Sequence, residues 1–152
     1  MLAFIITSVC ILLDQLTKYL VVEFIKGSKP LVIVEELLSF VYVENRGAAF
    51  GILQNKKWLF IVVTVISVAA LLYLFLFHYK KMSTWLIVSL SFVLGGTIGN
   101  FIDRMRLDYV VDFISVRIMN RYDFAVFNVA DSFIVIGAIM LMIHIIFLDS
   151  KG

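Results

Sequence analysis

The chain has 152 residues, of which 62% are hydrophobic, and its mean hydropathy is +1.05. Soluble domains are usually about 45–50% apolar, so this composition predicts a membrane protein, and the length suits one domain over residues 1–152. The net charge of +2 and the dispersed basic residues exclude a nucleic-acid surface, and the single cysteine, Cys10, excludes an intramolecular disulfide.

Four apolar segments approach the roughly 20 residues that a helix needs to cross a bilayer. They cover residues 2–24, 58–77, 82–102 and 124–148. Because lipid offers no partner to backbone amides, each segment is predicted to be a transmembrane helix. The polar turn of residues 78–81 is so short that the second and third helices must be antiparallel neighbours.

The two longer connections are expected on the same side of the membrane, because an even number of spans separates them. The first, residues 26–57, contains β-branched and aromatic runs at 31–34 and 38–43, which favour a small sheet. The second, residues 103–123, forms a further insert. The expected fold is therefore integral membrane α-helical, with four transmembrane helices, a small sheet and a second insert.

The distribution of basic residues leaves the orientation of the protein open. The face that carries both inserts holds most of them, and the opposite face holds only Lys80, Lys81 and Lys151. Taken literally, the positive-inside rule places the inserts in the cytoplasm. Several arginines on the insert face lie in motif-like contexts, and a functional role there would weaken this count.

Polar residues interrupt the first and third predicted helices. Asp14 and Lys18 are four residues apart and share one helix face. Either they neutralise each other, with Lys18 reaching toward the membrane interface, or they position a substrate or an insert. Asp103 and Arg104 close the third helix, either as a surface pair or as a brace for a site. Asn100 lies within the apolar segment and needs a partner.

Small residues mark two places where the backbone can approach a neighbour closely. Ser91, Gly95 and Gly99 recur every four residues in the third helix, a spacing that predicts tight helix packing. The run Asn45-Arg46-Gly47, followed by further small residues, comes after the second predicted strand. It is either an ordinary loop or, as its polar pair favours, a turn that brings Asn45 and Arg46 to a site.

Two aspartates in apolar sequence are the main candidates for chemistry. Asp112 lies in Val-Val-Asp-Phe-Ile, and Asp131 follows Asn128 by one turn on a shared helix face. A carboxylate in hydrocarbon costs about 2.5–3.5 kcal/mol, so it is retained mainly where it faces a polar interior and has a function. Either each aspartate is held separately by Asn or Arg, or the two share one water and one proton.

A shared proton would suit aspartic hydrolysis. Two carboxylates at one water cannot both ionise, so the ionised member takes a proton from the water while the protonated member polarises the scissile carbonyl. This chemistry needs no metal and no cofactor. His78 and His144 are remote in sequence from both aspartates, so neither a His-based metal site nor a serine triad is expected.

Five motifs in order resemble those of the lipoprotein signal peptidases, the bacterial type II signal peptidases, over nearly the whole chain. They are Asp14-Gln-Leu-Thr-Lys18, Asn45-Arg-Gly-Ala-Ala-Phe50, Gly95-Gly-Thr-Ile-Gly-Asn-Phe-Ile-Asp-Arg104, Val110-Val-Asp-Phe113 and Phe127-Asn-Val-Ala-Asp-Ser132. The resemblance implies an aspartic endopeptidase with Asp112 and Asp131 as its catalytic pair. It also implies supporting or substrate-binding roles for Asp14, Lys18, Asn45, Arg46, Gly47, Asn100, Asp103, Arg104, Asn128 and Ala130.

The resemblance further implies a substrate and a location. The substrate is expected to be a diacylglyceryl-modified prolipoprotein, cleaved just before its lipidated cysteine, and globomycin-type inhibitors are expected to occupy the catalytic pair. The family spans the bacterial cytoplasmic membrane with both termini inside. The site faces the extracytoplasmic side, together with a sheet cradle and an outer helical segment. This orientation is the opposite of the one that the positive-inside rule predicts from the basic residues. Membrane lipids are the other expected partners, and we expect a monomer.

Two further functions compete with this interpretation. A small four-helix transporter would use Asp14 as its ion site, but Lys18 already neutralises it and the two inserts would have no role. A structural membrane subunit would leave the polar residues of the third and fourth helices unexplained. Substitutions distinguish the transporter from the peptidase. A transporter should lose most activity when Asp14 is replaced, and a peptidase when Asp112 or Asp131 is replaced.

Overall fold

The computed structural model describes residues 1–47, 54, 56–118 and 122–148. Its helices are α1 (Leu2–Phe24), α2 (Lys57–His78), α3 (Thr84–Leu107) and α4 (Val129–Ile143), with the short turns η2 (Tyr79–Lys81) and η3 (His144–Leu148) after α2 and α4. Its strands are β1 (Leu31–Val34), β2 (Leu38–Asn45), β3 (Val110–Ile118) and β4 (Tyr122–Asp123). The four helices, α2 and α4 taken with their short turns, are long and apolar enough to cross a membrane, which confirms the predicted fold class.

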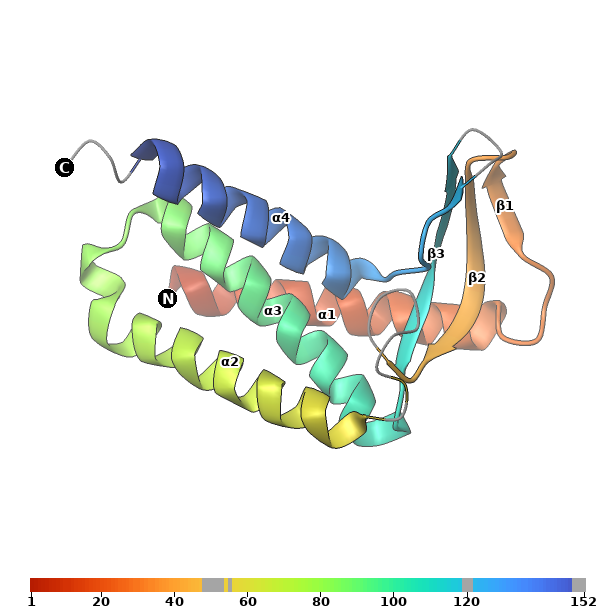
Figure 1. Cartoon of the computed structure of the whole chain (residues 1–152), viewed down its shortest axis with the longest axis horizontal. Coiled ribbons are helices and arrows are strands. Elements are labelled where there is room, and N and C mark those ends of the chain that lie inside the picture. The colour runs from red at the N-terminus through yellow and green to blue at the C-terminus, as the bar shows by residue number, and fades with distance from the viewer. Residues whose placement is uncertain (48–53, 55, 119–121, 149–152) are drawn as a thin grey trace.

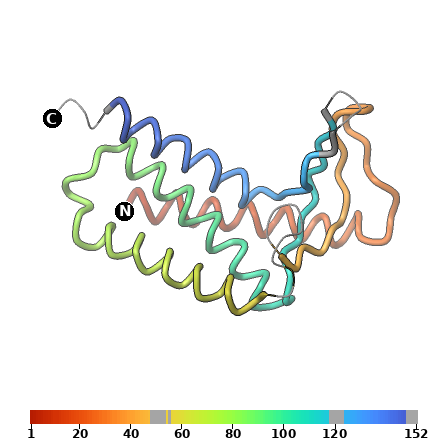
Figure 2. Tube along the Cα trace, viewed as in Figure 1, coloured from red at the N-terminus to blue at the C-terminus, as the bar shows by residue number. Residues whose placement is uncertain are grey.

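The helices form a bundle, and the sheet stands across one end of it (Figure 1). Successive helices run in opposite directions, and the start of α1 and the end of α4 lie at the end away from the sheet (Figures 1 and 2). α3 packs against α1, α2 and α4, and it is the most buried of the four. The other helices expose large apolar side chains, as a lipid-facing surface requires.

Small residues of α3 allow its neighbours to approach closely. A Cβ on Gly95 would lie 2.5 Å from the Cβ of Cys10 in α1. On the other side of the helix, a Cβ on Gly96 would overlap the carbonyl oxygen of Ala130 in α4. Any side chain at these positions would push the helices apart, so the tight packing predicted from the residue spacing is confirmed.

The sheet is antiparallel and has the strand order β1-β2-β3-β4. Asn45 at the end of β2 pairs with Val110, and Val43 pairs with Asp112. The predicted strands at 31–34 and 38–43 are confirmed. The sequence analysis did not predict β3, although residues 110–118 are rich in β-branched and aromatic residues.

The third helix extends beyond its predicted end at residue 102. α3 continues to Leu107 and ends at Asp108, whose φ of 69° is left-handed. Hydropathy misplaced this end because Asp103 and Arg104 in the last turns are held by partners inside the protein. The second insert therefore begins at residue 108 rather than 103.

The fourth helix begins later than its predicted start at residue 124. The backbone N–H of Ile114 donates to the carbonyl oxygen of Phe127 at 2.8 Å, and Phe127 donates back at 3.1 Å, so the segment before α4 pairs with β3. These apolar residues belong to the sheet side of the molecule, which is why hydropathy assigned them to the helix. The pairing brings β3 beside the N-terminus of α4.

Candidate active site

Asp112 and Asp131, called the dyad from here on, lie where the sheet meets the helical bundle. Asp112 lies on β3 and is only 2% exposed, and Asp131 lies in the first turn of α4. Both side chains line one pocket of about 570 Å³. The two aspartates that the sequence analysis paired are thus brought to a common site by the pairing of residues 124–127 with β3.

Three asparagines turn their amide nitrogens toward the dyad. Asn45 donates to Oδ2 of Asp112 at 2.8 Å, and Asn128 donates to its Oδ1 at 2.7 Å. Asn100 donates to Oδ1 of Asp131 at 2.8 Å, and the backbone N–H of Asn128 donates to its Oδ2 at 3.1 Å. Each of the four carboxylate oxygens therefore accepts one N–H and keeps a lone pair for a proton or a ligand.

Asn128 connects the two carboxylates. It is the N-cap of α4: its Oδ1 accepts from the backbone N–H of Asp131 at 2.9 Å, and Asp131 bonds back to the N-cap N–H, which completes a capping box. Its Nδ2 reaches Asp112 at the same time. One fully buried side chain thus fixes the first turn of α4 and both members of the dyad.

The environment of Asp112 favours its protonated form more than water does. Burial raises the pKa of Asp112 to about 6; the hydrogen bond from Asn45 opposes this rise, and the negative charge of Asp131 adds to it. Within the described ranges, no Lys or Arg forms an ion pair with either carboxylate. A carboxyl with a pKa near 6 can hold a proton close to neutral pH, as general acid catalysis requires.

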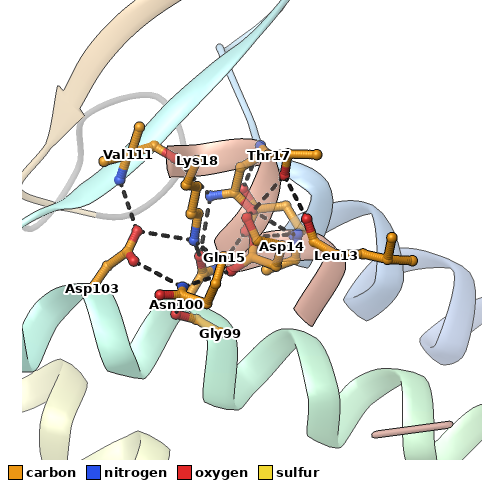
Figure 3. A network of polar contacts seen from close by, with 12 residues as sticks. Leu13, Asp14, Gln15, Thr17, Lys18, Gly99, Asn100, Asp103 and Val111 are labelled. Atoms are coloured by element: carbon orange, nitrogen blue, oxygen red, sulfur yellow. Dashed lines mark hydrogen bonds and ion pairs between the residues drawn. The ribbon is translucent and has the colours of Figure 1, made fainter. Parts of the chain in front are cut away.

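A second polar group, the ion-pair cluster of Asp14, Lys18 and Asp103, lies between α1 and α3 (Figure 3). Nζ of Lys18 lies 2.9 Å from Oδ2 of Asp14 and 3.0 Å from Oδ2 of Asp103. It also donates to Oδ1 of Asn100 at 2.9 Å. Lys18 is only 3% exposed, so the expectation that it reaches toward the membrane interface is wrong.

The ion-pair cluster also fastens α4 and β3 to the bundle. Oδ1 of Asp14 accepts from the backbone N–H of Ala130 at 3.0 Å, and Oδ2 of Asp103 accepts from that of Val111 at 3.1 Å. Gln15, which the sequence analysis did not select, donates to both aspartates. The sequence feature that could have identified Gln15 is an amide side chain in an apolar helix, next to a carboxylate. Asp14 is fully buried and does not line the pocket.

Arg104 lies in the pocket wall and contacts the turn that follows β2. Its Nη2 donates to the carbonyl oxygen of Gly47 at 3.4 Å, and its guanidinium lies 4.8 Å from the ring centre of Phe60 in α2. The backbone N–H of Gly47 in turn donates to Oδ1 of Asn45 at 2.9 Å. Arg104 thus braces the turn that presents Asn45 to Asp112.

Arg46 does not join the pocket. Its guanidinium pairs with Glu44 at 2.9 Å and lies 5.2 Å from the ring centre of Tyr109, and its side chain is half exposed. Of the run Asn45-Arg46-Gly47, the first and third residues line the pocket. Residues 48–50 of the same motif lie outside the described residues.

Most of the rest of the pocket wall is apolar. It is formed by Phe124, Ala125, Val126, Phe127, Ile134, Val135 and Ile136. About half of the surface of Val135 and Ile136 is exposed on the outer side of α4. The pocket therefore combines paired carboxylates with a partly exposed apolar surface. Among the described residues, no three His, Cys, Asp or Glu side chains are grouped so that they could hold a metal ion.

Comparisons with known proteins agree with this geometry. The family model described as signal peptidase (SPase) II matches residues 6–147. The chain is 46% identical to the lipoprotein signal peptidase of Caldanaerobacter subterraneus subsp. tengcongensis, over 95% of this chain and 96% of that protein. It is 45% identical to the one of Enterococcus faecalis over 98% and 89%, and 43% identical to the one of Streptococcus agalactiae over 97% and 94%.

Solved structures show the same fold. A bacterial membrane enzyme solved at 2.3 Å superposes with a TM-score of 0.83 and 33% identity, covering 98% of this chain and 89% of that one. A second, solved at 1.9 Å, gives a TM-score of 0.82 and 34% identity, covering 95% and 92%. The chain therefore belongs to the signal peptidase II family, as a membrane-spanning aspartic peptidase that removes signal peptides from lipoproteins.

Proposed function

We propose that the dyad hydrolyses the peptide bond just before the diacylglyceryl-modified cysteine of a prolipoprotein. The observation that carries this proposal is that Asp112 and Asp131 line one pocket and share Asn128, with an N–H donor on every carboxylate oxygen. That arrangement holds two carboxylates at one place while leaving lone pairs directed at a reacting group. It requires no metal and no cofactor.

In the proposed mechanism, the two carboxyls take different roles at one water. Asp112, whose pKa burial raises to about 6, is the member that carries the shared proton and donates it toward the scissile carbonyl. Asp131 takes a proton from the water, which attacks the carbonyl carbon. Because the N–H donors fix both carboxylates before substrate arrives, little reorganisation is needed in the transition state.

The mixed polar and apolar lining of the pocket supports a lipidated substrate. A diacylglyceryl group keeps the modified cysteine at the membrane surface, and acyl chains would lie against the apolar wall that includes Val135 and Ile136. The peptide bond before the cysteine would then face the dyad at the N-terminus of α4. Globomycin-type inhibitors would compete by occupying the same carboxylates.

The proposed orientation puts the sheet and the pocket on the extracytoplasmic side of the bacterial cytoplasmic membrane. Lipidated, exported substrates present their cleavage site there. The excess of basic residues on the sheet side does not oppose this placement strongly, because Lys26, Arg46 and Lys57 form local ion pairs there and Arg104 lines the pocket. Labelling with a membrane-impermeant maleimide on intact cells tests it: Ser28→Cys should react and Ser83→Cys should not.

The decisive test of the proposed function is cleavage of a diacylglyceryl-modified prolipoprotein by the purified chain in detergent or lipid. The expected result is loss of the signal peptide, inhibited by globomycin and absent in Asp131→Asn. The non-lipidated precursor should be cleaved far more slowly. If well-folded protein does not cleave the lipidated substrate, or if Asp131→Asn cleaves it at the wild-type rate, the proposal is wrong.

The same experiment separates the peptidase from the transporter. Asp14 has no free role as an ion site, because Lys18, Gln15 and the Ala130 N–H occupy its carboxylate oxygens. Asp14→Asn should therefore reduce stability more than it reduces the turnover of the protein that remains folded. A transporter would show the opposite ranking of Asp14 against Asp131.

A further inference from the structure

We propose that Lys18 is a positioning residue of the dyad, because it fixes which way the amide of Asn100 faces. This inference rests on the proposed function. Lys18 touches neither carboxylate of the dyad and does not line the pocket. It acts through Asn100, whose Nδ2 donates to Oδ1 of Asp131 at 2.8 Å.

An asparagine amide has one end that donates and one that accepts, so its neighbours decide its orientation. At each of the three asparagines around the dyad, the amide oxygen faces a group that can only donate. For Asn45 that group is the backbone N–H of Gly47 at 2.9 Å, and for Asn128 it is the backbone N–H of Asp131 at 2.9 Å. With the oxygen held, each NH₂ must point at a dyad carboxylate.

For Asn100 the donors are two side chains, Lys18 at 2.9 Å and the Nδ2 of Asn128 at 3.1 Å, and the shorter bond comes from the charged group. The Lys18 ammonium has three N–H groups and faces three oxygens at 2.9–3.0 Å, those of Asp14, Asp103 and Asn100 (Figure 3). It carries no lone pair, so the amide nitrogen of Asn100 cannot take that place. Lys18 is therefore the one of these three anchors that a substitution can remove.

Without the ammonium, the Asn100 oxygen is held only by the Nδ2 of Asn128, which also donates to Asp112, so the amide of Asn100 can turn over more easily. Its oxygen would then face Oδ1 of Asp131, and an attractive hydrogen bond would become a contact between two acceptors. The general base would lose a fixed donor, and Asn128, whose Nδ2 also reaches the Asn100 oxygen at 3.1 Å, would lose a partner. The expected consequence is slower chemistry with unchanged substrate binding.

A simple Lys18→Met variant is not sufficient as a test, since it would leave Asp14 and Asp103 buried without a cation. Removing one partner of a buried ion pair is strongly destabilising. The charge-matched variant Lys18→Met/Asp14→Asn keeps the net charge of the ion-pair cluster at the wild-type value, because one cation and one anion are lost together. Asp14→Asn alone is its control, since Lys18 and its bond to Asn100 remain.

The experiment measures kcat, KM and thermal stability of the wild type, Asp14→Asn and the double variant with the lipidated substrate. A hydrogen bond to a charged group is worth about ten- to a hundredfold in an equilibrium or rate. We expect the double variant to unfold at a lower temperature than Asp14→Asn, because Asp103 loses its cation. On equal amounts of folded protein, KM should be unchanged and kcat lower by about that factor. A kcat equal to that of Asp14→Asn would show that Lys18 has only a structural role and would overturn the inference.

A second variant decides the matter if the double variant does not fold. Asn100→Asp keeps the shape and the bond from Lys18 but replaces the amide donor with a carboxyl oxygen, so kcat should fall at least tenfold. Wild-type kcat in this variant would show that amide polarity is irrelevant. Failure of the proposed function looks different, because the wild type itself would then not cleave the substrate.

Discussion

The two groups of buried carboxylates in this protein are close together but are stabilised differently. Asp14 and Asp103 contact the ammonium of Lys18 at 2.9 and 3.0 Å. Asp112 and Asp131 are bonded by amide N–H groups, and within the described part of the chain no cation forms an ion pair with them. The first group joins α1, α3 and α4, and the second lines the pocket.

The difference shows how one protein can keep some carboxylates inert and others available for chemistry. An ammonium in contact stabilises a negative charge and consumes lone pairs, so such a carboxylate serves packing. Neutral amides orient a carboxylate without cancelling its charge. Burial then raises the pKa of Asp112 to about 6, where a proton can be exchanged near neutral pH.

The largest expected effect separates the two groups by activity. Asp112→Asn should lower kcat by about a thousandfold or more, because the variant cannot exchange the shared proton. Asp14→Asn should chiefly lower the unfolding temperature, because Asp14 bonds the N-terminus of α4. Cleavage assays on equal amounts of folded protein, with thermal unfolding measured in parallel, check both. Equal loss of turnover in the two variants would remove the distinction.

The pH dependence of activity should follow Asp112. With its pKa at about 6, the protonated fraction of Asp112 falls tenfold for each pH unit above that value. The value of kcat/KM should therefore fall on the alkaline side with an apparent pKa near 6, which belongs to the dyad as a pair. Initial rates from pH 5 to 9 measure it. A flat profile across this range would contradict the assignment of the proton to Asp112.

Stability should also depend on pH through Asp112. A raised pKa in the folded state means that the folded protein binds the proton more tightly than the unfolded chain does. The resulting stabilisation is present below about pH 4 and is lost as the pH rises through about 6, by about 3 kcal/mol. As the pH rises over this range, the unfolding free energy of the wild type should fall relative to that of Asp112→Asn, which cannot titrate at this position. Parallel curves would show that Asp112 titrates normally.

The ion-pair cluster can be disturbed without changing a charge. A Cβ on Gly99 would lie 2.5 Å from Oδ2 of Asp14, so Gly99→Ala should push α1 from α3 and cost about 1–3 kcal/mol. Ala70→Leu is the control, because Ala70 is exposed on α2 and a larger side chain there meets no packed neighbour. Thermal unfolding in detergent compares them, and equal unfolding temperatures would contradict the close packing.

The smallest expected effect concerns Arg46. Its guanidinium lies on Glu44 and Tyr109 rather than in the pocket, so Arg46→Gln should change kcat/KM by less than about twofold. Arg104→Gln should reduce turnover more, because Arg104 lines the pocket and bonds the carbonyl oxygen of Gly47. A larger effect at Arg46 than at Arg104 would mean that substrate binding extends to the exposed edge of the sheet.

The sequence predicted the bounds of a helix best where the apolar segment and the helix end at the same residue. The first helix, residues 2–24, has its predicted bounds, because apolar sequence and helical backbone stop together. α3 continues beyond its apolar segment because Asp103 forms an ion pair with Lys18. α4 begins later than predicted because Asn128 is its N-cap. Strand β3 was missed because a strand is recognised by its partner, β2, which lies far away in the sequence.

The sequence also identified the site residues better than their roles. Isolated polar residues in apolar sequence, such as Asp14, Asn100 and Asp131, were conspicuous because burying them is costly without a partner. Which partner each one takes was not visible. Lys18 turns inward, against the alternative in which it reaches outward. Arg46 was expected at the site but lies beside Glu44, and Gln15 was overlooked.

By itself, therefore, the sequence determined that this chain spans a membrane four times and carries a pair of aspartates near one boundary. Composition and segment length decide both, because lipid penalises every polar group along the chain. Only the tertiary structure decided that Asp112 and Asp131 share one pocket while Asp14 and Asp103 share one lysine. Those contacts depend on the distances between α1, α3, β3 and α4, which close packing around the glycines of α3 sets.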